Sequence, residues 1–185
     1  MNGNLAYQEE SRDELLNGKV FLMSSPSVNH NRVAFHIATA FQNHLKGKNC
    51  EAFADGTDVF LDKDRVIPDV MIVCNKEIIK KDGIHGAPDL VVEVLSPSTA
   101  KNDRGYKKDL YERTGVKEYW IADANLRSIE SYLLNDGKYC LHEIYRLPDD
   151  NMTDTEKECC KDTVVVSLYD DFTIPLQEIF FNLFR

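Results

Sequence analysis

The sequence contains no hydrophobic run long enough to cross a membrane. Its longest apolar stretches, around Leu90–Leu95 and Ile179–Phe184, fall far short of the ~20 residues that a membrane-spanning helix needs. Residues 1–16 include four acidic side chains and no apolar segment, so we expect no signal peptide. Both absences favour a cytoplasmic protein.

The five cysteines form no familiar pattern, because their number is odd, two of them are adjacent and no pair has CxxC spacing. A disulfide framework or a zinc site is therefore not expected, and reduced thiols are the simplest prediction. The motifs HExxH and GxGxxG and the P-loop are also missing. These absences remove the usual sequence signatures of zinc peptidases and nucleotide-binding domains.

Positive charge is scarce: 22 Lys and Arg residues stand against 31 Asp and Glu residues, which gives a net charge of −9. Nonspecific attraction to nucleic acid or to an anionic membrane should therefore be weak, and on composition alone a DNA-binding function ranks low. The length of 185 residues suits one domain. Within it, we expect residues 1–16 to form an N-terminal extension and residues 149–162 to form an acidic surface loop.

Two segments have the apolar spacing of amphipathic helices, residues 29–46 and 103–114. Asn102 is a candidate cap for the second helix, Gly115 is expected to end it, and Pro175 is expected to open a short closing helix. Strands are predicted at residues 20–23, 51–54, 58–61, 66–73, 89–95, 117–122, 129–134, 138–145 and 163–168. This order predicts an α+β or α/β fold in which a central mixed sheet is flanked by helices, with an extra C-terminal β-hairpin before the closing helix.

Two carboxylates interrupt predicted strands that are otherwise apolar, Asp69 within residues 66–73 and Glu93 within residues 89–95. Burial of an isolated charge is costly, so each group needs a basic partner, a bound cation or contact with water at a sheet edge. Two converging carboxylates would suit a hard divalent cation such as Mg²⁺. Asp89 has even spacing from Glu93, so it is either a supporting carboxylate or merely a polar strand end.

Basic residues are concentrated between positions 98 and 117, where six Lys and Arg residues against three acidic residues give a local charge of +3. Lys107 lies three residues before Leu110 and four before Tyr111, so helical geometry places it on the inner face of the helix. Asp103, four residues before Lys107, shares that face. The alternative interpretation is an ordinary solvated helix surface.

A pair of acids with a lysine is a suitable set for hydrolysing phosphodiester bonds. The acids would hold Mg²⁺, which polarises a phosphoryl oxygen and lowers the pKa of water. The lysine would orient the attacking water or help to deprotonate it, and it would offset negative charge in the transition state. These residues therefore indicate a metal-dependent hydrolase.

Several segments resemble a known family in their order and spacing. They are Pro68-Asp69-Val70, the run from Ala87 to Ser98, the stretch from Asp103 to Lys107, and Tyr111 followed by Gly115 to Trp120. These segments resemble the bacterial "putative restriction endonuclease" family of the PD-(D/E)XK nuclease superfamily. Weaker similarity extends over most of the chain. The resemblance implies a restriction-endonuclease-like fold, Mg²⁺ or Mn²⁺ as the cofactor, and DNA as the substrate of an endonuclease.

The resemblance also implies a role for each matching position. Asp69 and Glu93 would bind the metal together with the backbone carbonyl of Val94. The superfamily usually has a lysine two residues after the second acid, where this chain has Leu95. In this family a lysine from the following helix takes that place, at the position of Lys107.

Three other residues are candidates for supporting roles, namely His30, Asp89 and Asp103. His30 matches a histidine that precedes the family's first helix, so it would border the site or simply cap the helix. Two alternatives to a nuclease are a catalytically inactive descendant that binds or regulates, and a glycosidase with two carboxylates. A homodimer is expected by analogy, because cleavage of both strands of a duplex needs two active sites.

Overall fold

The structure, a computed structural model, describes residues 12–54 and 56–184. The helical elements are α1 (Val28–Leu45), the 3₁₀ turn η1 (Lys76–Ile78), α2 (Ala100–Asn102), the π-turn η2 (Asp103–Lys107), α3 (Lys108–Thr114), α4 (Asp154–Glu158) and α5 (Leu176–Ile179). The strands are β1 (Asp13–Leu16), β2 (Lys19–Leu22), β3 (Glu51–Ala54), β4 (Val59–Leu61), β5 (Asp64–Val66), β6 (Val70–Val73), β7 (Ile79–Lys80), β8 (Gly83–His85), β9 (Leu90–Val94), β10 (Glu118–Asp123), β11 (Ser128–Asn135), β12 (Lys138–Arg146), β13 (Thr163–Val165) and β14 (Thr173–Pro175).

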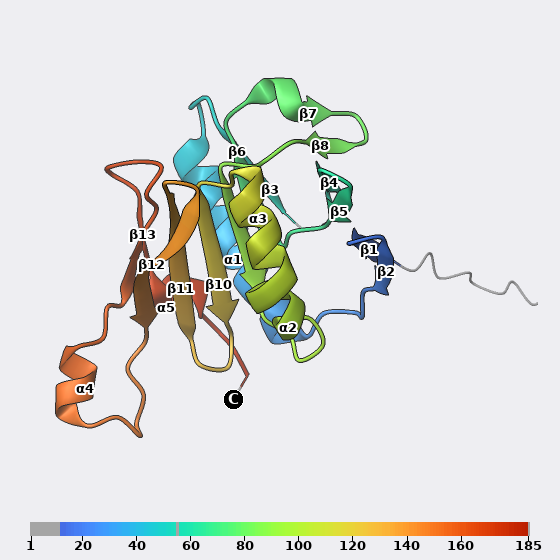
Figure 1. The fold of residues 1–185 in the computed structure, drawn as a ribbon. Coiled ribbons are helices and arrows are strands. Elements are labelled where there is room, and N and C mark those ends of the chain that lie inside the picture. The colour runs from blue at the N-terminus through green and yellow to red at the C-terminus, as the bar shows by residue number, and fades with distance from the viewer. Residues whose placement is uncertain (1–11, 55, 185) are drawn as a thin grey trace, which may run out of the picture.

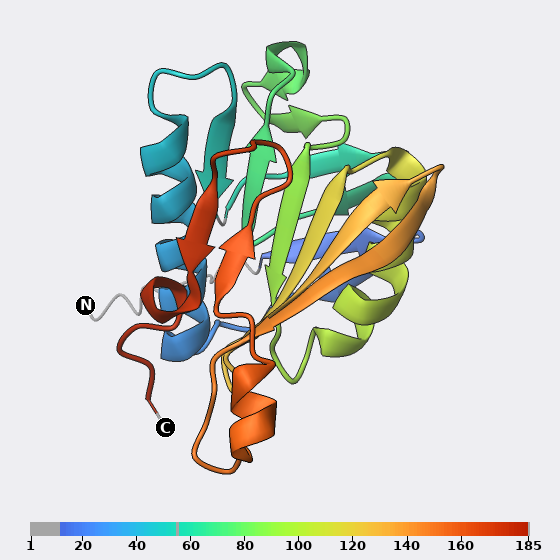
Figure 2. The same ribbon diagram turned by 90° about the vertical axis from the view of Figure 1, so that its left-hand side faces the viewer.

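Six strands form a central mixed sheet in the order β12-β11-β10-β9-β6-β3. Strands β9 and β10 run parallel, whereas the other neighbouring pairs of this sheet are antiparallel. Helix α1 covers one face of the sheet and α3 covers the other (Figure 1 and Figure 2). The prediction of a mixed sheet flanked by helices is confirmed. The hairpin of β11 and β12, however, extends this sheet and is not an addition to it.

A second sheet, in the order β2-β1-β5-β4-β8-β7, lies on the side of α3. The sequence pattern did not separate it from the first, because the predicted strand at residues 66–73 divides between the two sheets. Strand β5 ends at Val66 and β6 begins at Val70. Pro68 explains the division, since proline has no N–H for a ladder hydrogen bond. Asp69 therefore lies at the corner where the chain passes from one sheet to the other.

Strand β9 is buried along its whole length, as its near-continuous apolar sequence predicts. Leu90, Val92 and Val94 pack in one core with α1 and the C-terminal elements, whereas Val91 belongs to the core on the α3 side. Side chains alternate along a strand, so Glu93 projects to the same side as Val91. A carboxylate is thereby placed between the central sheet and the helix that carries Lys107.

This helix is longer than predicted and irregular. It begins at Ala100, passes through the π-turn η2 and ends at Gly115, which adopts a φ of 90°. The predicted end is confirmed, because glycine adopts this left-handed conformation without a steric penalty. The assignment of Asn102 as a helix cap is wrong, since Asn102 lies inside the helical run.

Both predicted peripheral segments contain regular structure. Part of the predicted N-terminal extension is strand β1, which forms a hairpin with β2, while residues 1–11 lie outside the described residues. The acidic loop contains α4. Thr153 and Glu156 form a reciprocal capping box at the start of this helix. Helix α5 follows Pro175, as predicted. Across residues 12–54 and 56–184, none of the helices combines the length and the apolar character needed to span a membrane.

Cys50 and Cys74 form a disulfide, so the prediction of reduced thiols is wrong for these two residues. Cys50 precedes β3 and Cys74 follows β6, and the antiparallel pairing of Glu51 with Val73 places the cysteines opposite each other. Their Cα atoms are 4.0 Å apart. Sequence spacing could not indicate this pair, because only the register of two strands brings the cysteines together. Free thiols remain at Cys140, Cys159 and Cys160.

Thiol titration in denaturant without a reductant should therefore detect the three free cysteines, and all five after reduction. Reduction should lower the free energy of unfolding by about 3 kcal/mol, because the bond closes a loop between residues 24 positions apart. Cys140→Ser, at an exposed free thiol, is the matched control and should leave stability nearly unchanged. Detection of five thiols before reduction would contradict the pairing.

Candidate active site

The central sheet brings the two predicted metal-binding acids together. Val70 of β6 pairs with Val92 of β9, so one further step along this antiparallel register places Asp69 beside Glu93. Asp69 Oδ2 accepts a 2.7 Å hydrogen bond from the backbone N–H of Val94, the residue after Glu93. The exposed fractions are 7% for Asp69 and 3% for Glu93. Two carboxylates thus share one enclosed position at the corner between the sheets.

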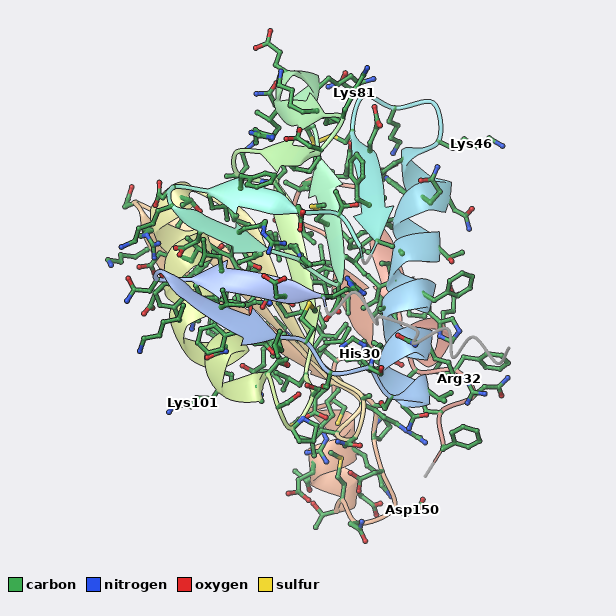
Figure 3. All side chains as sticks on the ribbon, turned by 90° about the vertical axis from the view of Figure 1, so that its right-hand side faces the viewer. His30, Arg32, Lys46, Lys81, Lys101 and Asp150 are labelled. Carbon is green, nitrogen blue, oxygen red and sulfur yellow. A yellow bond between two sulfur atoms is a disulfide. The ribbon has the colours of Figure 1, made fainter. Side chains whose placement is uncertain are left out.

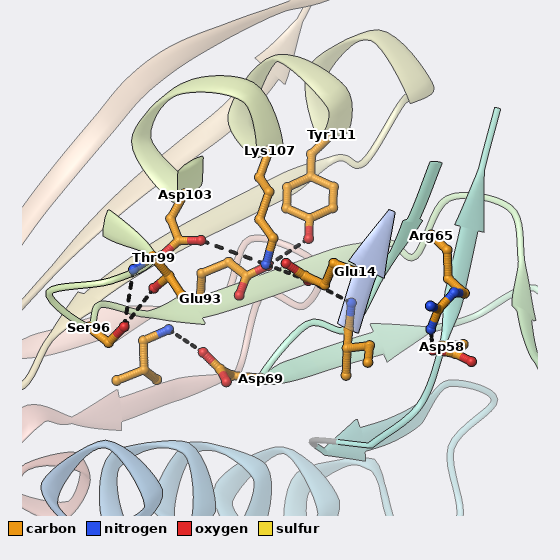
Figure 4. A network of polar contacts seen from close by, with 12 residues as sticks. Glu14, Asp58, Arg65, Asp69, Glu93, Ser96, Thr99, Asp103, Lys107 and Tyr111 are labelled. Carbon is orange, nitrogen blue, oxygen red and sulfur yellow. Dashed lines mark hydrogen bonds and ion pairs between the residues drawn. The ribbon is translucent and has the colours of Figure 1, made fainter. Parts of the chain in front are cut away.

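Lys107 reaches this position from η2, and its side chain is enclosed by acids (Figure 4). Its Nζ lies 3.0 Å from Glu93 Oε1, 2.8 Å from Glu14 Oε1 and 3.7 Å from Asp103 Oδ1. Lys107 and Asp103 are 2% and 1% exposed. The prediction that both face inward is confirmed, and a solvated helix surface is excluded for these two residues.

Burial and neighbouring charges together shift the pKa values of these groups. Burial raises the pKa of Glu93 well above its ordinary value, although the ammonium of Lys107 opposes the rise. Burial likewise raises the pKa of Asp103, again against Lys107. Burial alone would lower the pKa of Lys107, but the charges of Glu93, Glu14 and Asp103 raise it above its ordinary value. Lys107 therefore stays protonated, and the acids around it outnumber the cation that stabilises them.

Two tyrosines complete the polar contacts, and sequence reasoning gave them only packing roles. Tyr111 Oη donates a 2.6 Å hydrogen bond to Glu93 Oε1. Tyr119 Oη donates a 2.9 Å hydrogen bond to the backbone carbonyl of Asp103. Burial raises the pKa of both tyrosines well above the ordinary value, so both remain neutral donors. Tyr119 lies in the core, and its hydroxyl also supports the π-turn.

Glu14 is the acid that sequence reasoning missed. It belongs to β1, in which Glu14 and Leu16 are buried while their neighbours are partly exposed. Its Oε1 accepts hydrogen bonds from Lys107 Nζ at 2.8 Å and from the backbone N–H of Ile67 at 2.9 Å. A signal was present: Asn17-Gly18 is a typical two-residue hairpin turn, and alternation in the strand before it puts Glu14 on the face of Leu16.

A cavity of about 960 Å³ gives access to the cluster. Asp69, Glu93 and Lys107 contribute to its wall, and two hydroxyl-rich loops, residues 24–27 and 96–99, line it. Glu14 and Asp103 are not among the described residues that line the cavity, so these two acids contact Lys107 from outside it. The geometry leaves one side of the acid–lysine cluster open to a ligand.

His30 also lines this cavity and lies in the first turn of α1 (Figure 3). Its Nε2 is 3.3 Å from Asp69 Oδ2, and its backbone N–H donates to Ser27 Oγ, the helix cap. Of the two predicted alternatives, His30 therefore borders the site, and Ser27 provides the cap. Contact with Asp69 lets the imidazole fix the orientation of that carboxylate.

Asp89 is not brought to the cluster. It precedes β9, four residues from Glu93, and at ~3.3 Å per residue this separates their backbones by about 13 Å. Its carboxylate accepts hydrogen bonds from the Cys74 backbone N–H at 2.7 Å and from Lys117 Nζ at 2.7 Å. These contacts and the distance along the strand give Asp89 a structural role, that of the polar strand end.

The basic side chains between positions 98 and 117 are less available for binding a ligand than their net charge suggests. Four of its six basic side chains form ion pairs, namely Arg104, Lys107, Arg113 and Lys117. Lys108 lies over the ring of Tyr132, with Nζ 3.6 Å from the ring centroid. Most of this positive charge thus stabilises the fold, which leaves little of it for a polyanionic ligand.

The donor set fits a hard divalent cation. Across the described part of the chain, no group of three or more His, Cys, Asp or Glu side chains is arranged as a ready-made metal site. Asp69 and Glu93 are a pair of oxygen donors, however, and the hydrogen bonds above use only Asp69 Oδ2 and Glu93 Oε1. Three buried acids contact Lys107 and a fourth, Asp69, lies beside Glu93, so an added cation would reduce the excess of negative charge.

The chain is similar over most of its length to two uncharacterized proteins. An uncharacterized protein of Synechocystis sp. is 32% identical over 137 residues, covering 71% of this chain and 72% of the relative. A second uncharacterized protein of the same organism is 24% identical over 143 residues, covering 74% of this chain and 81% of the relative.

A solved structure from Anabaena variabilis, described as a putative nuclease of DUF820, shares the fold with a TM-score of 0.70. It is 16% identical, and the match covers 92% of this chain and 90% of that one. Residues 4–157 match the family Uma2, described as "Putative restriction endonuclease". Because this match spans most of the sequence, the chain belongs to the Uma2 family of restriction-endonuclease-like proteins.

Proposed function

We propose that the protein is a metal-dependent endonuclease that hydrolyses phosphodiester bonds of DNA. The observation that carries the proposal is the convergence of Asp69, Glu93 and Lys107 on one wall of an open cavity. The family description supports the reaction class, and the fold is that of a neighbour described as a "putative nuclease". An intact acid–acid–lysine set favours an active enzyme over a catalytically inactive binding module, which could lose any of the three.

We assign Mg²⁺, with Mn²⁺ as a substitute, to Asp69, Glu93 and the backbone carbonyl of Val94. The carboxylates of Asp69 and Glu93 would hold the ion, since the hydrogen bonds described above use only one oxygen of each group. When bound, the ion would polarise the phosphoryl group and lower the pKa of water. The backbone N–H of Val94 and the imidazole of His30 keep Asp69 in place.

Lys107 acts as a hydrogen-bond donor in this mechanism. Its neighbours raise its pKa above the ordinary value, so it is a poor proton acceptor and does not serve as the base. The ammonium instead orients the attacking water and offsets negative charge that develops on the phosphoryl oxygens. Tyr111 Oη donates to the same Glu93 oxygen as Lys107 Nζ, which restricts the movement of this carboxylate.

The net charge of −9 restricts how the substrate is held. Since much of the positive segment is engaged in ion pairs, binding through general electrostatic attraction should be poor and salt-sensitive. We infer that the substrate is held by the metal, by specific contacts along the hydroxyl-rich loops, or with the help of a second copy of the chain. A homodimer would also supply the second active site that double-strand cleavage requires.

Asp69→Asn and Glu93→Gln should each lower the rate of Mg²⁺-dependent DNA cleavage by about 100-fold or more. Each removes a negatively charged metal ligand and keeps the side-chain volume. Lys107→Met should have a similar effect. Lys108→Met is the matched control, since Lys108 is the next residue and contacts Tyr132 outside the cluster. The measurement is single-turnover cleavage by purified, folded variants. Wild-type rates in Asp69→Asn and Glu93→Gln would reject the assignment.

Metal binding can be tested without turnover. Addition of Mg²⁺ should raise the melting temperature of the wild-type protein, and a concentration 100 times the dissociation constant should add about 2.7 kcal/mol of stability. Asp69→Asn should lose this increase, whereas Asp89→Asn, which alters an acid outside the cluster, should keep it. An equal effect of Mg²⁺ on all three proteins would show that the ion binds elsewhere.

A further inference from the structure

We propose that Glu14 is the residue that positions Lys107, and that the N-terminal hairpin of β1 and β2 is therefore part of the active site. The catalytic consequence rests on the proposed function. The positioning itself rests on the contacts of Glu14 and can be tested separately. No feature of the acid–acid–lysine motif points to this residue, which precedes Asp69 by 55 positions along the chain.

The contacts of Glu14 link the lysine to the segment that holds the first metal-binding acid. The same Oε1 atom accepts from Lys107 Nζ at 2.8 Å and from the Ile67 backbone N–H at 2.9 Å. Ile67 is two residues before Asp69. Glu14 is 4% exposed, so water competes little for these hydrogen bonds. One carboxylate oxygen therefore fixes the ammonium relative to the corner where Asp69 lies (Figure 4).

Glu14 is suited to hold the lysine while the ion is bound. Lys107 is shared among three acids, of which Glu14 is the nearest at 2.8 Å and Asp103 the farthest at 3.7 Å. Glu93 would also contact the metal, so part of its charge would be directed away from the lysine. Glu14 is not assigned to the metal, and it is not among the described residues that line the cavity. It can therefore hold the ammonium in both states of the site.

The hairpin that carries Glu14 is fixed to the rest of the molecule at a second point. The backbone N–H of Asn17, in the hairpin turn, donates a 2.6 Å hydrogen bond to Asp64 Oδ1. Asp64 Oδ2 accepts from Tyr106 at 2.7 Å and from Arg113 at 2.8 Å. Tyr106 and Arg113 flank Lys107 along the helix. Asp64 therefore links the hairpin turn to the same helix that Glu14 contacts through Lys107, so the hairpin supports the lysine from two points.

Contacts of the neighbouring residue provide a matched control. Asp13, one residue before Glu14, is partly exposed and forms a 2.6 Å ion pair with Arg65, which also contacts Asp58 at 3.0 Å. This pair holds β1 against β5 but does not contact Lys107 in the described structure. Asp13→Asn therefore perturbs the same strand without altering the acid–lysine cluster.

The test compares Glu14→Gln, Glu14→Ala and Asp13→Asn. Cleavage by Glu14→Ala should show a kcat lower by about 100-fold with an unchanged KM, as expected when a reacting group is misplaced by about 1 Å. Glu14→Gln, which keeps the volume and an acceptor for Ile67 but loses the charge, should show a smaller loss of kcat. Asp13→Asn should retain the wild-type kcat.

A second readout does not depend on cleavage. Labelling with an amine-reactive reagent, followed by mass spectrometry, should leave Lys107 protected in the wild type and in Asp13→Asn, and should label it in Glu14→Ala. Lys108 provides the internal reference for reagent dose. Increased labelling of Lys107 in a protein without nuclease activity would support the positioning role and reject only the proposed function.

Two outcomes would overturn the proposal. One is a protected Lys107 with a wild-type kcat in Glu14→Ala. The other is a rise in KM at constant kcat in Glu14→Gln, which would mean that Glu14 shapes substrate binding and does not position the lysine. If Glu14→Ala does not fold, Glu14→Gln decides the question through the same two measurements, since it preserves the packing of β1.

Discussion

The burial of one ammonium group among several carboxylates is the interaction on which the rest of this structure depends. A buried charge is costly unless it is paired, and removing one partner leaves the others uncompensated. Lys107 has partners on three separate parts of the chain: Glu14 on β1, Glu93 on β9 and Asp103 on its own helix. The same contacts therefore join the N-terminal hairpin, the central sheet and the helix.

This arrangement would suit a further cation. Glu14, Asp69, Glu93 and Asp103 are all buried, and one lysine cannot balance them. Burial raises the pKa of Glu93 and of Asp103, which is the response of an acid whose charge is not fully compensated. A divalent ion between Asp69 and Glu93 would supply the missing positive charge at the wall of the cavity. The stability of the cluster and the proposed chemistry thus have the same electrostatic origin.

The scaffold positions these groups by strand register and by one break in the chain. Pairing of β6 with β9 sets Asp69 beside Glu93, and Pro68 ends one strand so that Asp69 stands at a corner. Strand β9 is buried along its length, and Glu93 meets solvent at the wall of the cavity. By contrast, Glu118 is equally buried but is satisfied by Trp120 and Ser167, and it has a purely structural role. Burial alone therefore does not identify a functional acid.

The features that depend on local periodicity could be predicted from the amino-acid sequence. The inward direction of Lys107 and Asp103 followed from helical spacing, the enclosure of Glu93 from the apolar run around it, and the end of the helix from Gly115. Tertiary structure alone decided which distant residues meet. Glu14 joins Lys107, Cys50 joins Cys74, and Asp89 is excluded from the cluster, because each outcome depends on how strands pair across the molecule. Periodicity specifies the face on which a side chain lies, whereas register and sheet order specify what lies opposite it.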